Sequence, residues 1–421
     1  MTDFKQKDFA DPIKGRKLRR RFPVIRILLL ILLILGFYRY EPEKPQTEQT
    51  LTEAGAPPKK ENAPQEVSLK KENEPKTEKK EDTFQANFLS RQKDKQLALN
   101  VLNVLGSQKP FGAVYLMVDG ANGEILAWGQ QQNFAPQELP SYLPDSSFPA
   151  ASLVKIVTAA AALESRRYSN HTEIPAIGRS VTLYKNQLEV PKNYNGKRVT
   201  LEKAFSLSMN SPIGIVGLDL GSKRLMSAAE RLGFNRLLAK GVPLESRYPL
   251  PSDDFAIAEA ASGFTDDITI SPLLAAAIVR SILLGKDPEM PWSPLLAPAY
   301  APVKAIGLNQ SPFKENTYYG LKRMLETTLK KGSARTSYNN PKVFYPYNKE
   351  RLRTGGKTGT KNVGNIRYEW YAGYARDRKN AKKALILVCL HMNEINGTRA
   401  SHPAQASALL TNYWAKSYLQ W

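Results

Sequence analysis

The pattern of apolar and polar positions changes near residue 87. A long stretch of polar residues ends there, and apolar residues recur at regular spacing after it. From there, apolar side chains recur at helical spacing over residues 88–106 and predict an amphipathic helix. Short apolar runs of the kind that form strands follow at five places. These strands are expected at 113–118, 124–128, about 352–361, 370–376 and 384–390. An Asn-Gly pair between the first two predicts a hairpin turn.

Between the second and third of these strands the pattern is mostly helical. Phe148–Glu164, with the sequence FPAASLVKIVTAAAALE, predicts one unbroken helix. Thr200–Phe234 predicts two helices, broken near Ser211-Pro212 and again at Gly221-Ser222. The C-terminal run from His402 predicts a further helix that packs on one face of the sheet.

Together these elements predict an α/β protein. A central antiparallel five-stranded sheet is flanked by helices, and an all-helical lobe extends from Ser152 to about Leu284. The cleft between the lobe and the sheet is the expected place for a binding site. Trp370 and Tyr371 are expected in the core near this cleft, whereas Glu369 is expected at the surface.

The N-terminal region is predicted to anchor the protein in a membrane. Residues 1–21 form a basic tail, and residues 22–40 contain an apolar run. As a helix this run extends about 28 Å, enough to span a bilayer core if Arg26 snorkels to the inner headgroups. The positive-inside rule then places the tail in the cytoplasm and the remainder outside. A cleaved signal peptide is the alternative, but no small-x-small cleavage site follows Leu35.

Residues 41–86 are rich in Glu, Lys, Pro and Gln and nearly lack large apolar side chains. Such a segment cannot bury enough surface to offset its ordering entropy, so it predicts a disordered tether. A flexible chain of this length spans roughly 35–40 Å. The folded domain is therefore expected to occupy residues 87–421, at a distance from the membrane.

Charge and cysteine content narrow the function classes. The chain carries 60 Lys and Arg against 39 Asp and Glu, and most of the excess follows residue 86. A basic surface suits anionic surroundings such as lipid headgroups, wall polymers or nucleic acid, and charge alone does not choose among them. The single cysteine, Cys389, excludes an internal disulfide. The three histidines lack metal-ligand spacing, so neither a metal site nor a cofactor is expected.

The predicted helix at Phe148 carries the first candidate chemistry, Ser-x-x-Lys at Ser152 and Lys155. Residues three apart lie on one helix face, which places an amine beside a hydroxyl. A serine becomes a good nucleophile when a base takes its proton, and a lysine can be that base if burial or a second cation lowers its pKa. Taken alone, the tetrapeptide also fits a polar first turn on a core helix.

Two further motifs follow. Ser-x-Asn, at Ser208 and Asn210, stands at the predicted helix break, although Ser and Asn also favour ordinary turns. Lys-Thr-Gly-Thr runs from Lys357 to Thr360 on a predicted glycine-rich strand. Glycines there allow a ligand to approach the backbone, and an edge strand can bind an extended peptide as an added strand.

In this order, the three motifs resemble the signature of the penicillin-binding protein transpeptidase domain. Further segments of the chain resemble that domain's landmarks and span about Gly112 to His391. They are GEILAWG, TLEKAFSLSMNSP, ISPLLAAAIVRSILL, KKGSARTSY, and GKTGT followed by EWYAGYA.

The resemblance implies a role for each motif residue of the helical lobe. Ser152 would be the acylated nucleophile, and Lys155 would take its proton. Ser208 would relay a proton to the leaving amine. Asn210 would bind the substrate's peptide carbonyl and help to hold Lys155.

The resemblance also implies roles on the strand. Lys357 would support the field around Ser208 and the substrate carboxylate. Thr358, Gly359 and Thr360 would bind substrate, the two threonines through the carboxylate and backbone of the stem peptide. The backbone N–H groups of Ser152 and Thr360 would form the oxyanion hole, each such donor contributing roughly 3–4 kcal/mol to acyl transfer.

The implied reaction is acyl transfer at the D-Ala–D-Ala amide of a peptidoglycan stem peptide. The acyl-enzyme would pass to an amine of a neighbouring stem, giving a D,D-transpeptidase, or to water, giving a D,D-carboxypeptidase. β-Lactam antibiotics would acylate the same serine. AASLVK departs from the PGSTFK common in high-mass transpeptidases, whereas SMN favours transpeptidases, so the motifs differ on transfer versus hydrolysis.

Other readings stay open at the sequence level. A class A β-lactamase uses a Glu-x-x-x-Asn, which is missing between Ser211 and Gly356, and a class D enzyme would want Val or Ile where Asn210 stands. A catalytically silent scaffold that binds wall peptide or senses β-lactams is the non-enzymatic alternative.

The resemblance and the anchor together imply a location and partners. A single-pass protein of the bacterial inner membrane would hold its catalytic domain in the periplasm or outside the cell. Its partners would be stem peptides, β-lactams and the membrane. A separate glycan polymerase, or division or elongation proteins, would be further partners. No nucleic acid is expected, because a domain beyond the anchor does not meet the genome.

Overall fold

The computed structural model describes residues 88–132, 146–236, 246–293, 313–398 and 400–419. The predicted tail, anchor and tether lie outside these residues. Among the described residues, no helix combines the length and the apolar composition that a membrane crossing requires. The predicted helix at 88–106 is represented by a short turn at 88–90 followed by α3, Lys95–Gln108, whose N-terminus is capped by Asp94.

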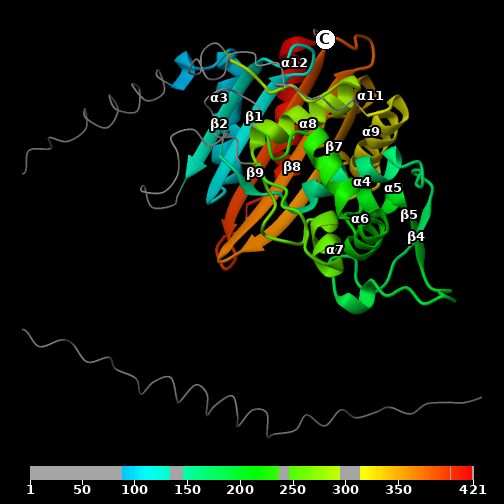
Figure 1. The fold of residues 1–421 in the computed structure, drawn as a ribbon. Helices are drawn as coiled ribbons and strands as arrows, with labels where there is room; N and C mark the ends of the chain where they lie inside the picture. The colour runs from blue at the N-terminus through cyan, green and yellow to red at the C-terminus, as the bar shows by residue number, and fades with distance from the viewer. Residues whose placement is uncertain (1–87, 133–145, 237–245, 294–312, 399, 420–421) are drawn as a thin grey trace, which may run out of the picture. The chain divides into compact units, whose positions relative to one another are not determined.

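The five predicted strands form one antiparallel sheet, and this prediction is confirmed. The strands are β1 (Gly112–Asp119), β2 (Ile125–Gln132), β7 (Leu352–Val363), β8 (Ile366–Asp377) and β9 (Ala384–Glu394). Their order is β2-β1-β9-β8-β7, so the last strand in the chain lies at the centre and β7 at an edge (Figure 1).

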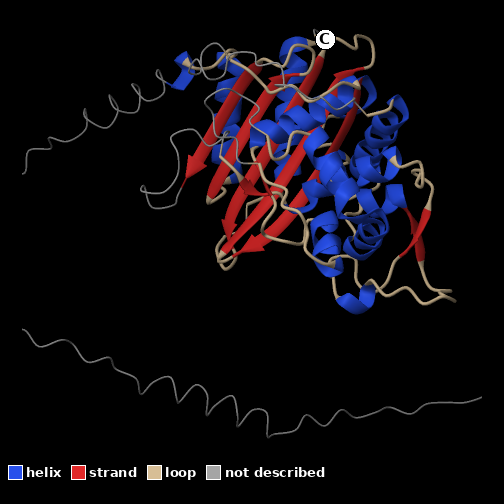
Figure 2. Cartoon of the chain, in the orientation of Figure 1, coloured by secondary structure: helices blue, strands red, loops and turns tan. Residues whose placement is uncertain are grey.

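Helices cover both faces of this sheet (Figure 2). One face packs on α8 (Pro272–Leu284) and, through it, on the helical lobe; the other packs on α3 and on α12 (Pro403–Tyr418). The predicted C-terminal helix is thereby confirmed. Side chains alternate between two apolar cores along each central strand, as the two-residue period of a strand requires. Trp370 belongs to the lobe-side core and Tyr371 to the other, so the prediction that both are core residues is confirmed.

The lobe is built mainly from helices. They are α4 (Lys155–Glu164), α5 (Leu201–Ser206), α6 (Asn210–Arg231), α7 (Asp254–Ser262) and α9 (Glu315–Lys330). The lobe also contains two small ribbons, so the all-helical prediction was wrong in detail. Their strands are β3 (Phe148–Pro149) with β6 (Thr269–Ile270), and β4 (Glu173–Pro175) with β5 (Arg198–Thr200). Short helices η3 (Lys185–Gln187), α10 (Arg335–Tyr338) and α11 (Pro346–Arg351) complete the described elements.

Two helix boundaries differ from the predictions. Phe148–Glu164 is not one helix, because Phe148–Pro149 pairs with β6 and Ala151–Val154 forms a 3₁₀ turn, η2, before α4. The predicted break near Ser211-Pro212 lies a few residues earlier, at 207–209, and Pro212 stands in the first turn of α6. A proline fits there since the first turn needs no N–H donor. The break predicted at Gly221 is a kink with φ of 77° inside α6.

Glu369 is fully buried, so its predicted place at the surface was wrong. It stands on β8, which is paired on both sides by β7 and β9, and its side chain accepts a hydrogen bond from Asn393 Nδ2 at 3.3 Å. A charged residue is usually expected at the surface, but in an interior strand its burial depends on which elements pack over that face. The residue type alone does not predict this packing.

Candidate active site

Ser152 and Lys155 are brought together by the 3₁₀ turn η2. Residues i and i+3 eclipse each other in this conformation, and Lys155 Nζ lies 2.7 Å from Ser152 Oγ. The preceding residue, Ala151, has a positive φ of 48°, which an L-residue adopts only at a cost. The backbone is thus bent at the candidate nucleophile, as it often is where a side chain must be presented to a ligand.

Lys155 is fully buried and has three hydrogen-bond partners. Besides Ser152 Oγ, its Nζ contacts Asn210 Oδ1 at 2.8 Å and the Ser262 carbonyl at 2.6 Å. Burial, and secondly the charge of Lys357, lower the pKa of Lys155 well below its ordinary value. A neutral amine has two N–H donors for the two carbonyl oxygens and one lone pair for the serine hydroxyl. The surroundings therefore suit a base that takes the Ser152 proton.

The Ser-x-Asn motif lies between α5 and α6, next to this pair. Ser208 has a positive φ of 57°, a second strained position beside the site. Asn210 begins α6 and is buried; its Nδ2 donates to the Val181 carbonyl at 3.0 Å, which fixes the amide so that Oδ1 faces Lys155.

The edge strand β7 supplies the third motif. Lys357 is fully buried, and its Nζ donates to Ser208 Oγ at 3.0 Å and to the Thr358 carbonyl at 2.7 Å. Burial lowers the pKa of Lys357 to about 7. Neither Lys357 nor Lys155 has a carboxylate within ion-pair distance among the described residues. Their positive charge is therefore uncompensated, which disfavours the protonated forms.

Glycines allow β7 and α7 to approach the nucleophile. A Cβ on Gly359 would lie 3.3 Å from the Ser152 nitrogen, and one on Gly263 would lie 2.0 Å from the Ala151 carbonyl oxygen. The strand therefore lies directly against η2 without intervening side chains. This contact places the backbone of β7 beside the Ser152 N–H, as an oxyanion hole made from both segments requires.

Ser333 is a site residue that sequence reasoning did not select. Its hydroxyl is hydrogen-bonded to Thr358 Oγ1, and its N–H donates to the Ser206 carbonyl at 3.0 Å. It therefore joins the end of α5 to the motif strand. The segment KKGSARTSY, which contains Ser333, was part of the family resemblance. Nothing in the sequence distinguishes Ser333 from an ordinary serine in a glycine-containing turn.

One pocket of about 760 Å³ contains most of the predicted site residues. Lys155 and Lys357 do not line it; they lie buried behind the hydroxyls that do. Of the described residues that line it, none is acidic. They are Ser152, Val181, Leu207, Ser208, Asn210, Gly263, Phe264, Ser333, Thr358, Gly359, Thr360, Lys361, Asn362, Arg367 and His402.

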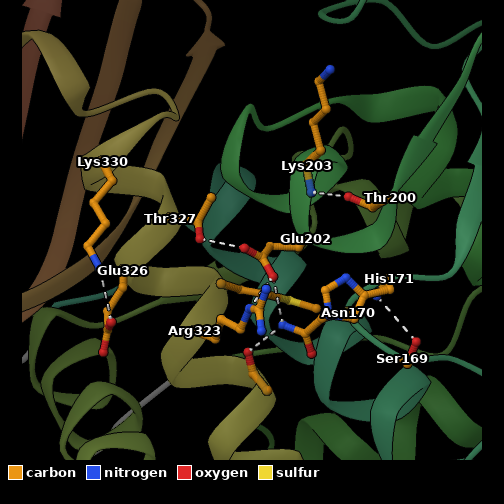
Figure 3. A network of polar contacts seen from close by, with 12 residues as sticks. Ser169, Asn170, His171, Thr200, Glu202, Lys203, Arg323, Glu326, Thr327 and Lys330 are labelled. Atoms are coloured by element: carbon orange, nitrogen blue, oxygen red, sulfur yellow. Dashed lines mark hydrogen bonds and ion pairs between the residues drawn. The ribbon is translucent and has the colours of Figure 1, made fainter.

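A polar network holds α5, which leads into the Ser-x-Asn motif, against α9 (Figure 3). Glu202 of α5 accepts hydrogen bonds from Arg323 Nε at 2.8 Å and from Thr327 Oγ1 at 2.6 Å. Asn170 donates to the same carboxylate at 3.3 Å and to the Gly320 carbonyl at 3.0 Å. The network joins α5 to α9, and α5 leads directly into the segment that carries Ser208.

The chemistry of the site resides in hydroxyls and amines. Within the described ranges, no group of His, Cys, Asp and Glu side chains is arranged to hold a metal ion. Cys389 is fully buried, and burial raises the pKa of its thiol well above the ordinary value. Two hydroxyls of the pocket lie beside a buried amine, Ser152 beside Lys155 at 2.7 Å and Ser208 beside Lys357 at 3.0 Å.

Comparisons with known proteins show the fold and the family of the chain. No curated protein matches the sequence. Among solved structures, the fold is similar to the transpeptidase domain of FtsI4 D,D-transpeptidase from Legionella pneumophila. The two chains share 15% identity with a TM-score of 0.50, over 78% of this chain and 96% of that one. The family described as the penicillin binding protein transpeptidase domain matches residues 113–410. The chain therefore belongs to the penicillin-binding protein transpeptidase domain family.

Proposed function

We propose that the protein is a membrane-anchored D,D-transpeptidase that cross-links peptidoglycan stem peptides through an acyl-enzyme on Ser152. The observation that carries the proposal is the convergence of the three motifs on one pocket. Lys155 Nζ contacts both Ser152 Oγ and Asn210 Oδ1, and Lys357 Nζ contacts Ser208 Oγ. Three segments far apart in sequence thus form one hydrogen-bonded unit.

Acylation follows from the protonation states that burial favours. Neutral Lys155 accepts the Ser152 proton as Oγ attacks the carbonyl carbon of the D-Ala–D-Ala amide. The developing oxyanion is stabilised by the backbone N–H groups of Ser152 and Thr360. The C–N bond then breaks as the leaving D-alanine nitrogen takes the proton of Ser208 Oγ, and Ser208 is reprotonated with the proton that Lys155 took from Ser152, so Lys155 is neutral again. Lys357 Nζ, 3.0 Å from Ser208 Oγ, holds this hydroxyl in place. The products are an ester on Ser152 and free D-alanine.

The fate of the ester separates the transpeptidase from its alternatives. Water needs a general base to attack an ester quickly, and none of the described pocket-lining residues is a carboxylate. A neutral amine is a better nucleophile than water and needs less assistance. The composition of the lining therefore supports transfer to an acceptor amine over a β-lactamase, with a D,D-carboxypeptidase as the nearer alternative.

The first test is intact mass spectrometry of the full chain in detergent after incubation with benzylpenicillin. A stable adduct on the wild type and none on Ser152→Ala would support the acyl-enzyme. Hydrolysed antibiotic without an adduct would instead indicate a β-lactamase, and intact antibiotic without an adduct would indicate a silent scaffold. The second test supplies a stem pentapeptide and an amine acceptor. A transpeptidase yields the joined peptide, whereas a carboxypeptidase yields only the tetrapeptide.

The location is part of the proposal. Residues 22–40 would anchor the protein in the bacterial inner membrane, residues 1–21 would stay in the cytoplasm, and the tether 41–86 would hold the domain in the periplasm or outside the cell. Protease added to spheroplasts should then degrade the domain and leave a cytoplasmic control protein intact; protection of the domain would overturn this topology. A separate glycan polymerase is the expected partner, and a pull-down from membranes that recovers none would count against it.

A further inference from the structure

Arg367 lines the pocket but belongs to none of the three motifs. It stands near the start of β8, where it pairs in register with Asn362 of β7, and its Nε donates to Asn362 Oδ1 at 3.1 Å. The side chain is partly exposed. Because a single hydrogen bond on Nε orients the guanidinium, its two terminal NH₂ groups are left to bind a ligand.

Charge accounting distinguishes Arg367 from its neighbours. Lys361, the lysine of the lining, is paired with Asp266 at 2.8 Å and also contacts the Phe264 carbonyl. His402 uses Nδ1 to accept from the Ala404 N–H at 3.1 Å at the start of α12. Arg367 has no acidic partner among the described residues. The pocket therefore holds one uncompensated guanidinium whose fork matches a carboxylate.

The register of β7 shows where this guanidinium lies relative to the reacting atoms. Gly359 lies against the Ser152 nitrogen. On the N-terminal side of Gly359, the strand carries Thr358, which is hydrogen-bonded to Ser333. On the C-terminal side, Asn362 lies two residues after Thr360 and is paired with Arg367 of β8. Two residues of strand extend about 7 Å. A substrate bound along β7 thus has the Thr358–Ser333 pair at one end and Arg367 at the other.

We propose that Arg367 is a specificity-determining residue that binds a carboxylate on the donor peptide, one or two residues before the residue that acylates Ser152. The inference rests on the proposed function, in which the terminal carboxylate of the donor goes to the threonines of the motif. The residues of the peptide that precede the scissile bond then lie along the other part of β7, toward Arg367. The favoured donor carries a dicarboxylic residue there.

Two penicillins provide a matched probe. Carbenicillin differs from benzylpenicillin by one added carboxylate on the acyl side chain, the part of the molecule that corresponds to the residue before the acylated position. The experiment measures the acylation rate constant of the full chain in detergent with each compound, for the wild type and for Arg367→Gln. Arg376→Gln is the matched control, because Arg376 is an arginine of the same strand that does not line the pocket and lacks an acidic partner among the described residues.

The expected result is a change in a ratio. Arg367→Gln should lower the rate with carbenicillin, relative to benzylpenicillin, by about tenfold, because a charge-assisted hydrogen bond to a carboxylate is lost. Arg376→Gln should leave the ratio unchanged. A second pair, thioester donors with Glu or Gln before the acylated D-Ala, should show the same preference and the same loss.

The outcomes separate this inference from the proposed function. If both penicillins acylate Ser152 and Arg367→Gln changes neither the penicillin ratio nor the donor ratio, the carboxylate site is wrong and the acyl-enzyme stands. An equal fall with all compounds would also overturn it, because the residue would then act on structure and not on a carboxylate. If the wild type is acylated by none of them, the proposed function fails and this inference fails with it.

Discussion

At the scale of single residues, the site depends on lysines held in an apolar setting. Lys155 and Lys357 are both fully buried, and neither forms an ion pair with a carboxylate in the part of the chain that the structure describes. Burial of this kind costs stability when the amine is charged, and that cost favours the neutral form that a base needs. The charge of Lys357 also lowers the pKa of Lys155, after burial.

Replacing Lys155 tests its role as the base. Lys155→Met keeps the length of the side chain and removes the amine, so the acylation rate constant with benzylpenicillin should fall by about 10²- to 10⁴-fold. Lys223→Met, at an exposed position on α6, should leave the rate unchanged. Far-UV circular dichroism identifies any loss of fold. A well-folded Lys155→Met that acylates at the wild-type rate would show that another group takes the proton.

The buried lysines also make stability depend on pH. Lys357 loses its proton near pH 7 in the folded protein, whereas its ordinary pKa is 10.5. Between these values the unfolded chain binds more protons, so the free energy of unfolding should rise with pH, by up to about 1.4 kcal/mol per pH unit for one lysine. Lys357→Met should reduce this slope between pH 7 and 10.

Urea unfolding at a series of pH values measures that slope, and Lys223→Met is again the control. The same slope in the wild type and Lys357→Met would mean that Lys357 keeps its proton in the folded state up to its ordinary pKa. Lys155 is expected to contribute a similar rise, since burial lowers its pKa in the same direction.

At the scale of elements, two helices end with a glycine of the same backbone conformation, but only one of these glycines is packed tightly against a neighbouring segment. Gly263 ends α7 with φ of 68° and Gly285 ends α8 with φ of 69°. A methyl group on Gly263 would meet the Ala151 carbonyl at 2.0 Å, whereas on Gly285 the nearest atom is 3.9 Å away. The conformational cost of a non-glycine residue is thus the same at both sites. Only at Gly263 would an added side chain also clash with η2.

The pair Gly263→Ala and Gly285→Ala separates these effects. Both should lose about 1–2 kcal/mol of unfolding free energy from the left-handed conformation. Gly263→Ala should lose more and should also slow acylation by benzylpenicillin, because Ala151 and Ser152 must move. Denaturant unfolding and acylation kinetics on both variants check this. Equal rates in the two variants would show that the tight approach of α7 is not needed to place the nucleophile.

Much of this arrangement could be predicted from the sequence. The five apolar runs gave the strands of the sheet, and the order and spacing of the motifs pointed to the residues that gather in the pocket. The 3₁₀ turn at Ala151–Val154 was missed because its small and apolar residues also suit a helix. Glu369 was misplaced because its burial depends on strand order, which brings β9 beside β8. Ser333 and Arg367 were missed because only the fold brings them to the pocket.

At the scale of the whole molecule, the charge is unevenly placed. Residues 41–86 are slightly acidic, whereas the region that follows carries most of the net charge of +21. A strongly basic domain should adsorb to anionic wall polymers, and screening should weaken the adsorption as salt rises. Co-sedimentation of the full chain with isolated cell walls, from low to high salt, measures this. Adsorption that does not change with salt would exclude an electrostatic origin.

The central position of β9 has a consequence for how the protein is made. Ribosomes synthesise β1 long before β9, yet β1 meets β8 and β7 only across β9. A chain synthesised only as far as the Lys-Thr-Gly-Thr motif therefore still lacks β9, the strand that joins β1 to β8. If the domain is exported as proposed, Lys357 would be held in the finished sheet only after β9 had emerged, because β7 reaches β1 only through β8 and β9.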